Sequence, residues 1–227
     1  MPIVPTNVNY NYSLMSQNLS ILNNIYPFLN IQSVANSVLG KNIYVIKLGR
    51  GTKKVFYSAS IHANEWITSV LLMKFIENYC IAYTNNSKLY GYSVRELFDS
   101  VSIYIMPMAN PDGVDLVTNS LEKSSLAYLS ALNISNQFSD IPFPSGWKAN
   151  IRGVDLNLQF PAGWENAKEI KYAQGFDKPA PRDFVGFRST NRTWVFSYLW
   201  FYTYSRFFSN NCLSYSRPRN LLEFSKY

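Results

Sequence analysis

The chain's only histidine, His62, is followed three residues later by Glu65. Side chains three positions apart lie on the same side of a helical turn, so an imidazole and a carboxylate can face one point in space. Both groups are ligands of Zn²⁺ in proteins, although a catalytic zinc normally takes three protein ligands and a water molecule. The same spacing is also typical of a glutamate that stabilises the first turn of a helix. The pair is therefore a candidate metal site that needs a further ligand.

The elements predicted on either side place this pair where a strand meets a helix. Residues 42–48 and 54–60 each read as a strand, and the turn at 50–52 between them predicts a hairpin. After His62, apolar residues recur at near-helical spacing from 67 to 79, which predicts a long helix. Strand ends are where α/β sheets commonly place their sites, so this position favours the metal interpretation.

The rest of the chain continues the alternation of strands and helices. Residues 13–26 predict a helix that Pro27 ends, and residues 94–100 predict a short helix. Residues 101–109 read as a buried strand ending in a turn at 110–113, and residues 136–165 read mostly as loop. Strands that alternate with helices predict an α/β sheet covered on both faces.

Composition excludes several classes of protein. Of the 227 residues, 47% are hydrophobic and 15% charged, which argues against a disordered chain and against a coiled coil. No uncharged apolar run of about 18 residues occurs, so no stable membrane span is expected. The first residues lack the basic and apolar regions of a secretory signal, which predicts a cytoplasmic protein unless another route exports it. Cys80 and Cys212 alone cannot form a disulfide framework.

The composition changes near residue 187. Residues 1–186 carry 15 Lys or Arg and 13 Asp or Glu, a net charge of +2, whereas residues 187–227 carry 6 and 1, a net charge of +5. Thirteen of the 37 aromatic residues lie in these last 41 positions, which contain no Gly, Ala, Asp or His. Segment 193–208 can be a buried strand or helix, a membrane-surface segment, or sequence unrelated to the rest, as after a frameshift. A basic segment can also bind nucleic acid, but no such partner is expected for the first 186 residues.

Three motifs occur in order, each in its predicted structural setting. They are HANEW at 62–66 after a strand, NPDG at 110–113 after another strand, and GVDLN at 153–157, with Phe160-Pro161 just beyond it. On these motifs the chain from about residue 10 to residue 186 resembles the carboxypeptidase A-like zinc metallopeptidases. It is most similar to their bacterial branch that cleaves γ-D-glutamyl-diamino acid bonds in peptidoglycan peptides. The resemblance implies a mixed β-sheet flanked by helices on both faces, Zn²⁺ as cofactor and a peptide substrate.

The resemblance also implies roles for individual residues. His62 and Glu65 match the first two zinc ligands of the family, and Lys148 stands where relatives carry a cation, usually Arg, that stabilises the oxyanion of the tetrahedral intermediate. An ammonium group can do this as a point charge. Arg152 lies in the same loop and is a competing candidate for binding substrate charge, and a solvated loop lysine is the alternative for Lys148.

Asn157 matches an asparagine that helps bind the terminal carboxylate of the substrate. The next position is an arginine in typical carboxypeptidases and is Leu158 here, which cannot pair with a carboxylate. This difference favours the peptidoglycan branch over trimming of free C-termini. Asp155 is expected to orient a ligand or the loop backbone, because a ligating histidine usually donates its second N–H to such an acceptor.

The family also needs a third zinc ligand, which is a second histidine well downstream of the first, and a general-base glutamate. The chain has no second histidine, and its only carboxylate side chain after Asp183 is Glu223, in a context unlike that of the family. We therefore expect a C-terminally truncated catalytic domain over residues 1–186 and an unrelated aromatic, basic tail over residues 187–227. Such a chain is expected to be inactive or impaired as a peptidase. The alternatives are a non-catalytic peptide-binding remnant, and association with membrane or nucleic acid through the tail.

Overall fold

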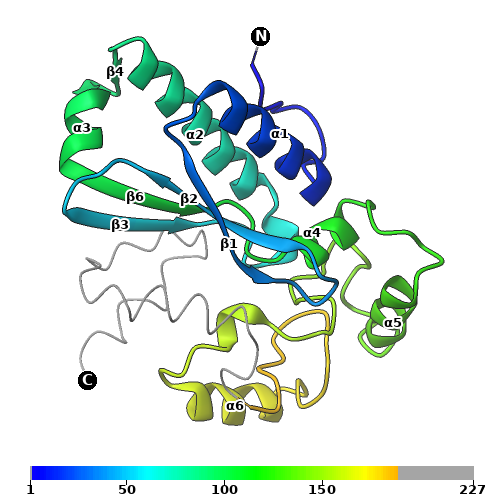
Figure 1. Cartoon of the computed structure of the whole chain (residues 1–227). Coiled ribbons are helices and arrows are strands. Elements are labelled where there is room, and N and C mark those ends of the chain that lie inside the picture. The colour runs from blue at the N-terminus through cyan, green and yellow to red at the C-terminus, as the bar shows by residue number, and fades with distance from the viewer. Residues whose placement is uncertain (1, 189–227) are drawn as a thin grey trace.

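A computed structural model describes residues 2–188 of the chain, and Figure 1 shows their arrangement. Helices and strands alternate through the first half, and helices and loops make up the second. The elements in chain order are α1 (Tyr12–Ile25), β1 (Asn30–Asn36), β2 (Asn42–Leu48), β3 (Lys53–Ser58), the 3-10 helix η1 (Ala63–Glu65), α2 (Ile67–Thr84), β4 (Lys88–Leu89), β5 (Tyr92–Ser93), α3 (Val94–Ser100), β6 (Val101–Met106), α4 (Pro111–Val117), α5 (Leu126–Ser135), the 3-10 helix η2 (Leu156–Leu158) and α6 (Trp164–Ala173).

The principal sheet of the described residues has the strand order β1-β2-β6-β3. β1 and β6 both run antiparallel to β2, and β3 runs parallel to β6, so the predicted mixed sheet is confirmed. The predicted hairpin of residues 42–48 with 54–60 is wrong, because β6 lies between these two strands. The connection between them passes close to the start of β6, where Gly49 and Gly51 leave no room for a Cβ against the backbone of Ser100 and Val101. The missed strand β1 forms the hairpin with β2 instead.

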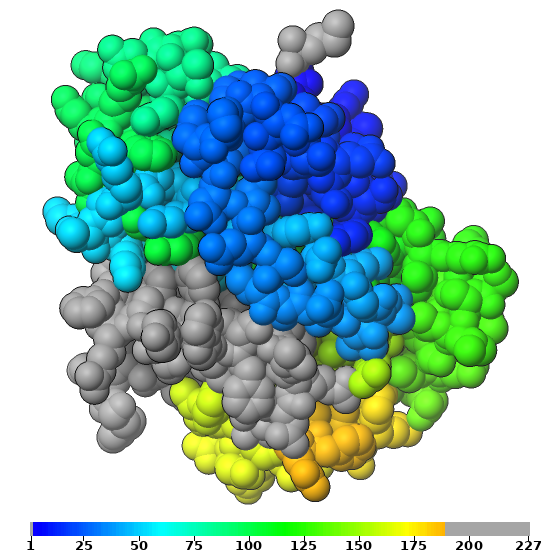
Figure 2. Space-filling view, in the orientation of Figure 1, coloured from blue at the N-terminus to red at the C-terminus, as the bar shows by residue number. Residues whose placement is uncertain are grey.

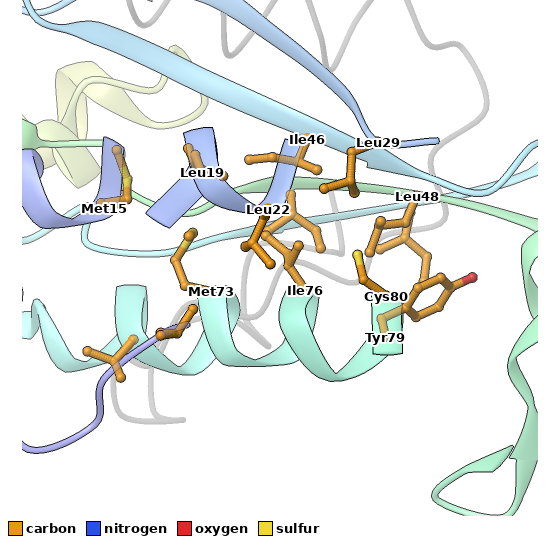
Figure 3. Packing of buried hydrophobic residues seen from close by; sticks show 14 of the residues in the cluster. Met15, Leu19, Leu22, Leu29, Ile46, Leu48, Met73, Ile76, Tyr79 and Cys80 are labelled. Carbon is orange, nitrogen blue, oxygen red and sulfur yellow. The ribbon is translucent and has the colours of Figure 1, made fainter. Parts of the chain in front are cut away.

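One face of the sheet is covered by α1 and α2, and Figure 3 shows this packing from close by. Side chains at alternate positions of β2 and β6 point into this layer, as the period of two in a strand requires. Burial of such side chains contributes roughly 25 cal/mol for each Å² of apolar surface removed from water. The residues labelled in Figure 3 are Met15, Leu19, Leu22, Leu29, Ile46, Leu48, Met73, Ile76, Tyr79 and Cys80.

The opposite face carries a smaller cluster, formed by Ile43, Val45, Phe56 and Met106 together with Leu156 of η2. Figure 1 shows α6 and the segments around it on the other side of the sheet from α1 and α2. The predicted sheet with helices on both faces is therefore confirmed. In Figure 2, α5 and its flanking loops project from this body at the right of the view. Among the helices of residues 2–188, none has both the length and the apolar character needed to cross a membrane.

Local predictions agree with most of the early elements. The helix expected over 13–26, the strand over 42–48 and the helix over 94–100 are confirmed. The turn expected at 110–113 is wrong, because these residues begin α4. Asn110 accepts the N–H of Gly113 as the N-cap, and Pro111 occupies the first helical position, where its missing N–H has no consequence. Helices α5 and α6 were not predicted.

Candidate metal site

The site lies just beyond the end of β3, where the backbone makes a sharp turn. Ser60 adopts a left-handed conformation with φ of 51°, which is uncommon for a residue with a side chain. Its N–H donates to Thr68 Oγ1 over 3.0 Å, and its hydroxyl lies 2.6 Å from Ser69 Oγ. Thr68 Oγ1 in turn donates to the carbonyl of Glu65 over 2.7 Å. The first turn of α2 therefore fixes the connection that carries the metal-ligand candidates.

His62 and Glu65 face each other as the sequence predicts. Nδ1 of His62 lies 3.1 Å from Oε1 of Glu65, and the imidazole is buried whereas the carboxylate is partly exposed. The other ring nitrogen, Nε2, lies 3.3 Å from Oδ1 of Asp155. Asp155 also accepts the N–H groups of Asn157 and Asp183, each over 3.1 Å. The imidazole is thus held from behind, with Nδ1 directed toward Glu65.

The electrostatics of His62 follow from these two carboxylates. Burial lowers the pKa of the imidazole, but the hydrogen bonds to Asp155 and Glu65 and their negative charges outweigh it and raise the pKa to about 9. The two carboxylates therefore favour the protonated imidazole. A metal ion that binds through Nδ1 must displace that proton, as metal binding to histidine generally requires.

The loop that carries Lys148 is attached to the same strand end. The carbonyl of Lys148 accepts the N–H of Ala63 over 3.0 Å, and its own N–H donates to the carbonyl of Pro181 over 2.8 Å. Its side chain is partly buried, and no ion pair involving it occurs within residues 2–188. Arg152 is exposed, and its backbone N–H donates to Asn150 Oδ1. The structure thus places the Lys148 backbone beside the residue that follows His62, and shows no such link for Arg152.

Asn110 connects the segments around the pair. It is buried, and its Nδ2 donates to the carbonyl of Ala149 over 2.9 Å and to that of Ile61 over 3.3 Å. Its Oδ1 caps α4 through Gly113, which packs against Ala63. One amide therefore joins the strand end, α4 and the Lys148 loop. The NPDG motif predicted a turn and not this joining role, although an Asn before Pro is a recognisable helix-start signal.

Asn157 lies in η2, two residues beyond Asp155, and is partly buried, as is Leu158. Its backbone donates to Asp155, so the substrate-binding candidate and the acceptor behind His62 belong to one short turn. The role of Asp183 in this turn was missed, because a contact 28 positions away along the chain leaves no local sequence signal.

Residues 2–188 contain no group of three or more His, Cys, Asp and Glu side chains arranged to hold a metal ion. His62, Glu65 and Asp155 are adjacent, but Asp155 contacts the ring nitrogen that points away from Glu65. The described part of the chain therefore presents two converging candidate ligands, one nitrogen and one oxygen, and not a complete coordination sphere.

Comparison with known proteins gives a consistent result. The profile of the zinc carboxypeptidase family matches residues 15–206. The chain is 42% identical over 180 residues to gamma-D-glutamyl-L-diamino acid endopeptidase 1 of Lysinibacillus sphaericus, which covers 78% of this chain and 43% of that protein. It is 27% identical over 159 residues to carboxypeptidase M of Mus musculus, covering 67% of this chain and 30% of that one. The chain therefore spans less than half the length of these relatives.

Solved structures agree at the level of the fold. Thrombin activatable fibrinolysis inhibitor aligns with a TM-score of 0.66 and 16% identity, covering 92% of this chain and 48% of that one. Carboxypeptidase A from Helicoverpa armigera aligns with a TM-score of 0.56 and 18% identity, covering 84% and 41%. The resemblance inferred from the three motifs is confirmed: the chain belongs to the zinc carboxypeptidase family.

Proposed function

We propose that this chain carries half of a zinc peptidase site, built for γ-D-glutamyl-diamino acid bonds of peptidoglycan peptides. The observation that supports this most directly is the convergence of His62 Nδ1 and Glu65 Oε1, 3.1 Å apart, with Asp155 behind the imidazole. The proposed substrate class is supported by the 42% identity to an endopeptidase with this specificity in its name.

The two side chains fit zinc as a pair. Ligand atoms about 2.0–2.1 Å from a tetrahedral zinc lie about 3.3 Å from each other, close to the separation of this nitrogen and oxygen. The Asp155 contact leaves Nδ1 as the coordinating nitrogen, as a second-shell carboxylate does in known zinc sites. Between the two in sequence, Asn64 Oδ1 is buried and has no hydrogen-bond partner among residues 2–188. A zinc ion in a complete site would polarise the scissile carbonyl and acidify a bound water.

The chain's own residues have separate proposed roles. Lys148, in the loop bonded to Ala63, is the cation that we propose to bind a developing oxyanion, and the charge of this partly buried residue would be less screened than that of a fully exposed one. Arg152 is exposed and suits an outer contact with substrate charge. Asn157 binds a polar group of the peptide. Leu158 cannot pair with a terminal carboxylate, which favours cleavage within a peptide over removal of its last residue.

We further propose that this chain is impaired as a peptidase. It has one histidine in 227 residues, so it cannot supply the family's third zinc ligand, which is a second histidine. Two protein ligands bind zinc weakly compared with three, and the general-base glutamate has no counterpart among the described residues.

The boundary at residue 186 and the membrane or nucleic acid interpretations of the tail concern residues that lie mostly outside those described. A non-catalytic peptide-binding protein is the alternative that the retained Lys148 and Asn157 support.

The test combines metal content with turnover. The purified chain is titrated with zinc against a chromophoric chelator, alongside the His62→Ala and Glu65→Gln variants and the matched control Glu96→Gln at an exposed position of α3. The proposal predicts weak binding of one zinc in the wild type and the control, and its loss in the two site variants. Equal binding in all four proteins would refute the site. Rapid hydrolysis of a γ-D-glutamyl-diaminopimelate peptide by the wild type would refute the proposed impairment.

A further inference from the structure

A short segment, residues 181–184, contacts both halves of the candidate site. The carbonyl of Pro181 accepts the N–H of Lys148 over 2.8 Å. On the other side, the carbonyl of Phe184 accepts the N–H of Asp155 over 2.8 Å, and the N–H of Asp183 donates to Asp155 Oδ2 over 3.1 Å. This segment therefore joins the loop of the candidate oxyanion cation to the carboxylate that holds the imidazole.

Asp183 makes its contact from an unusual backbone conformation. Its φ is 67°, in the left-handed region that is unfavourable for a residue with a side chain. Asparagine and aspartate tolerate this region better than other non-glycine residues do. In this conformation the N–H of Asp183 donates to Asp155. A strained residue of this kind persists only where its surroundings determine it, and such residues concentrate at functional sites.

The side chain of Asp183 is fixed by two cations. Oδ1 lies 2.7 Å from Lys171 Nζ of α6, and Oδ2 lies 2.6 Å from Arg182 Nε. Burial opposes the charge, but the hydrogen bonds from Lys171 and Arg182 lower the pKa of the carboxyl group, so it is ionised at neutral pH. An unbroken series of contacts thus runs from α6 through Asp183 and Asp155 to the imidazole of His62.

We propose that Asp183 is a positioning residue for the candidate metal site. Its left-handed backbone supplies the N–H that holds Asp155, and Asp155 holds Nε2 of His62, so that Nδ1 stays directed toward Glu65. The proposal rests on the proposed function, because the pair being positioned is the metal pair. It assigns to Asp183 an effect on metal binding that an ion pair serving only the fold would not have.

Two substitutions separate the backbone from the ion pair. Asp183→Gly and Asp183→Val both remove the carboxylate, but glycine enters the left-handed region freely whereas a β-branched residue does not. The proposal predicts that the glycine variant keeps zinc affinity within about threefold of wild type. The valine variant is expected to lose about tenfold or more, the range seen when outer-shell partners of metal ligands are removed. If the valine variant does not fold, Asp183→Ala takes its place with a smaller expected loss.

A second readout does not need zinc. Because His62 is the only histidine, the chain labelled with ¹⁵N-histidine gives imidazole signals from one residue. The proposal predicts a slowly exchanging Nε2–H signal in the wild type and in Asp183→Gly, and rapid exchange in Asp183→Val. Equal exchange in the glycine and valine variants, or equal loss of zinc in both, would overturn it. Failure of the wild type to bind zinc would refute the proposed function, while this signal would still decide the role of Asp183.

Discussion

Replacement of Gly113 by alanine tests whether α4 really packs against the candidate site. A Cβ at this position would lie 2.7 Å from Ala63 Cβ, 2.7 Å from Asn110 Nδ2 and 2.8 Å from the carbonyl oxygen of Ala149. All three separations are shorter than van der Waals contact. Two of these atoms cannot move without the backbone, and the third, Asn110 Nδ2, is held by its hydrogen bonds to the carbonyls of Ile61 and Ala149. The backbone of α4 must therefore move away from η1 or the Lys148 loop.

The magnitude follows from three opposing contributions. Alanine gains about 1 kcal/mol over glycine in a helix interior. Overpacking of a tight contact costs typically 1–3 kcal/mol, at about 2 kcal/mol here. Weakening the buried hydrogen bonds of Asn110 adds about 1 kcal/mol. Gly113→Ala should therefore destabilise the chain by about 2 kcal/mol although it places a better helix former in a helix.

Urea unfolding followed by tryptophan fluorescence provides the assay. With a denaturant dependence of about 2 kcal/mol per molar urea, the midpoint should fall by about 1 M. The matched control is Ser130→Ala at an exposed position of α5, which should leave the midpoint unchanged or slightly raised. A midpoint for Gly113→Ala equal to or above that of wild type would refute the packing of α4 against Ala63.

Two further substitutions test the contacts that support the fold and the site. Glu77 is buried, accepts hydrogen bonds from the N–H groups of Ile3 and Val4, and forms an ion pair with Lys74. Glu77→Gln should therefore lower the free energy of unfolding by about 2 kcal/mol at pH 7, as measured by urea unfolding. Burial opposes its charge, but Lys74 and the two N–H groups lower its folded pKa below the ordinary 4.5, so this contribution is complete above pH 4.5. It is lost as pH falls through the folded pKa, and the wild type and variant should therefore converge in acid; a constant difference would contradict the argument. Asn110→Ala should cost about 2 kcal/mol through the lost cap and unsatisfied carbonyls, and an unchanged midpoint would exclude its joining role.

The sequence predicts the local parts of this molecule better than its pairings. The helix ending before Pro27 and the convergence of His62 with Glu65 depend on residues a few positions apart, and the structure confirms both. The hairpin was wrongly predicted because two strands joined by a short glycine-containing turn normally pair with each other. Here the hydrophobic positions of β6 fit between them, which requires a contact about 50 positions away along the chain.

The same limit applies to the site. Asp155, which contacts Nε2 of His62, lies 93 residues further along the chain. It was predicted only because a ligating histidine generally needs an acceptor for its second N–H. The bracing contact from Asp183 had no local signal, because a left-handed aspartate has no distinctive spacing in sequence. The candidate ligands were therefore predicted from motifs and Asp155 from a general rule, whereas the contact made by Asp183 became evident only from the fold.

X-ray absorption spectroscopy of the zinc-loaded chain tests the central claim most directly. If His62 and Glu65 hold the ion, the zinc spectrum should show one imidazole nitrogen and carboxylate or water oxygens, and the imidazole scattering should disappear in His62→Ala. A spectrum without imidazole scattering in the wild type, or one unchanged by the substitution, would contradict the assignment of these two residues as the metal pair.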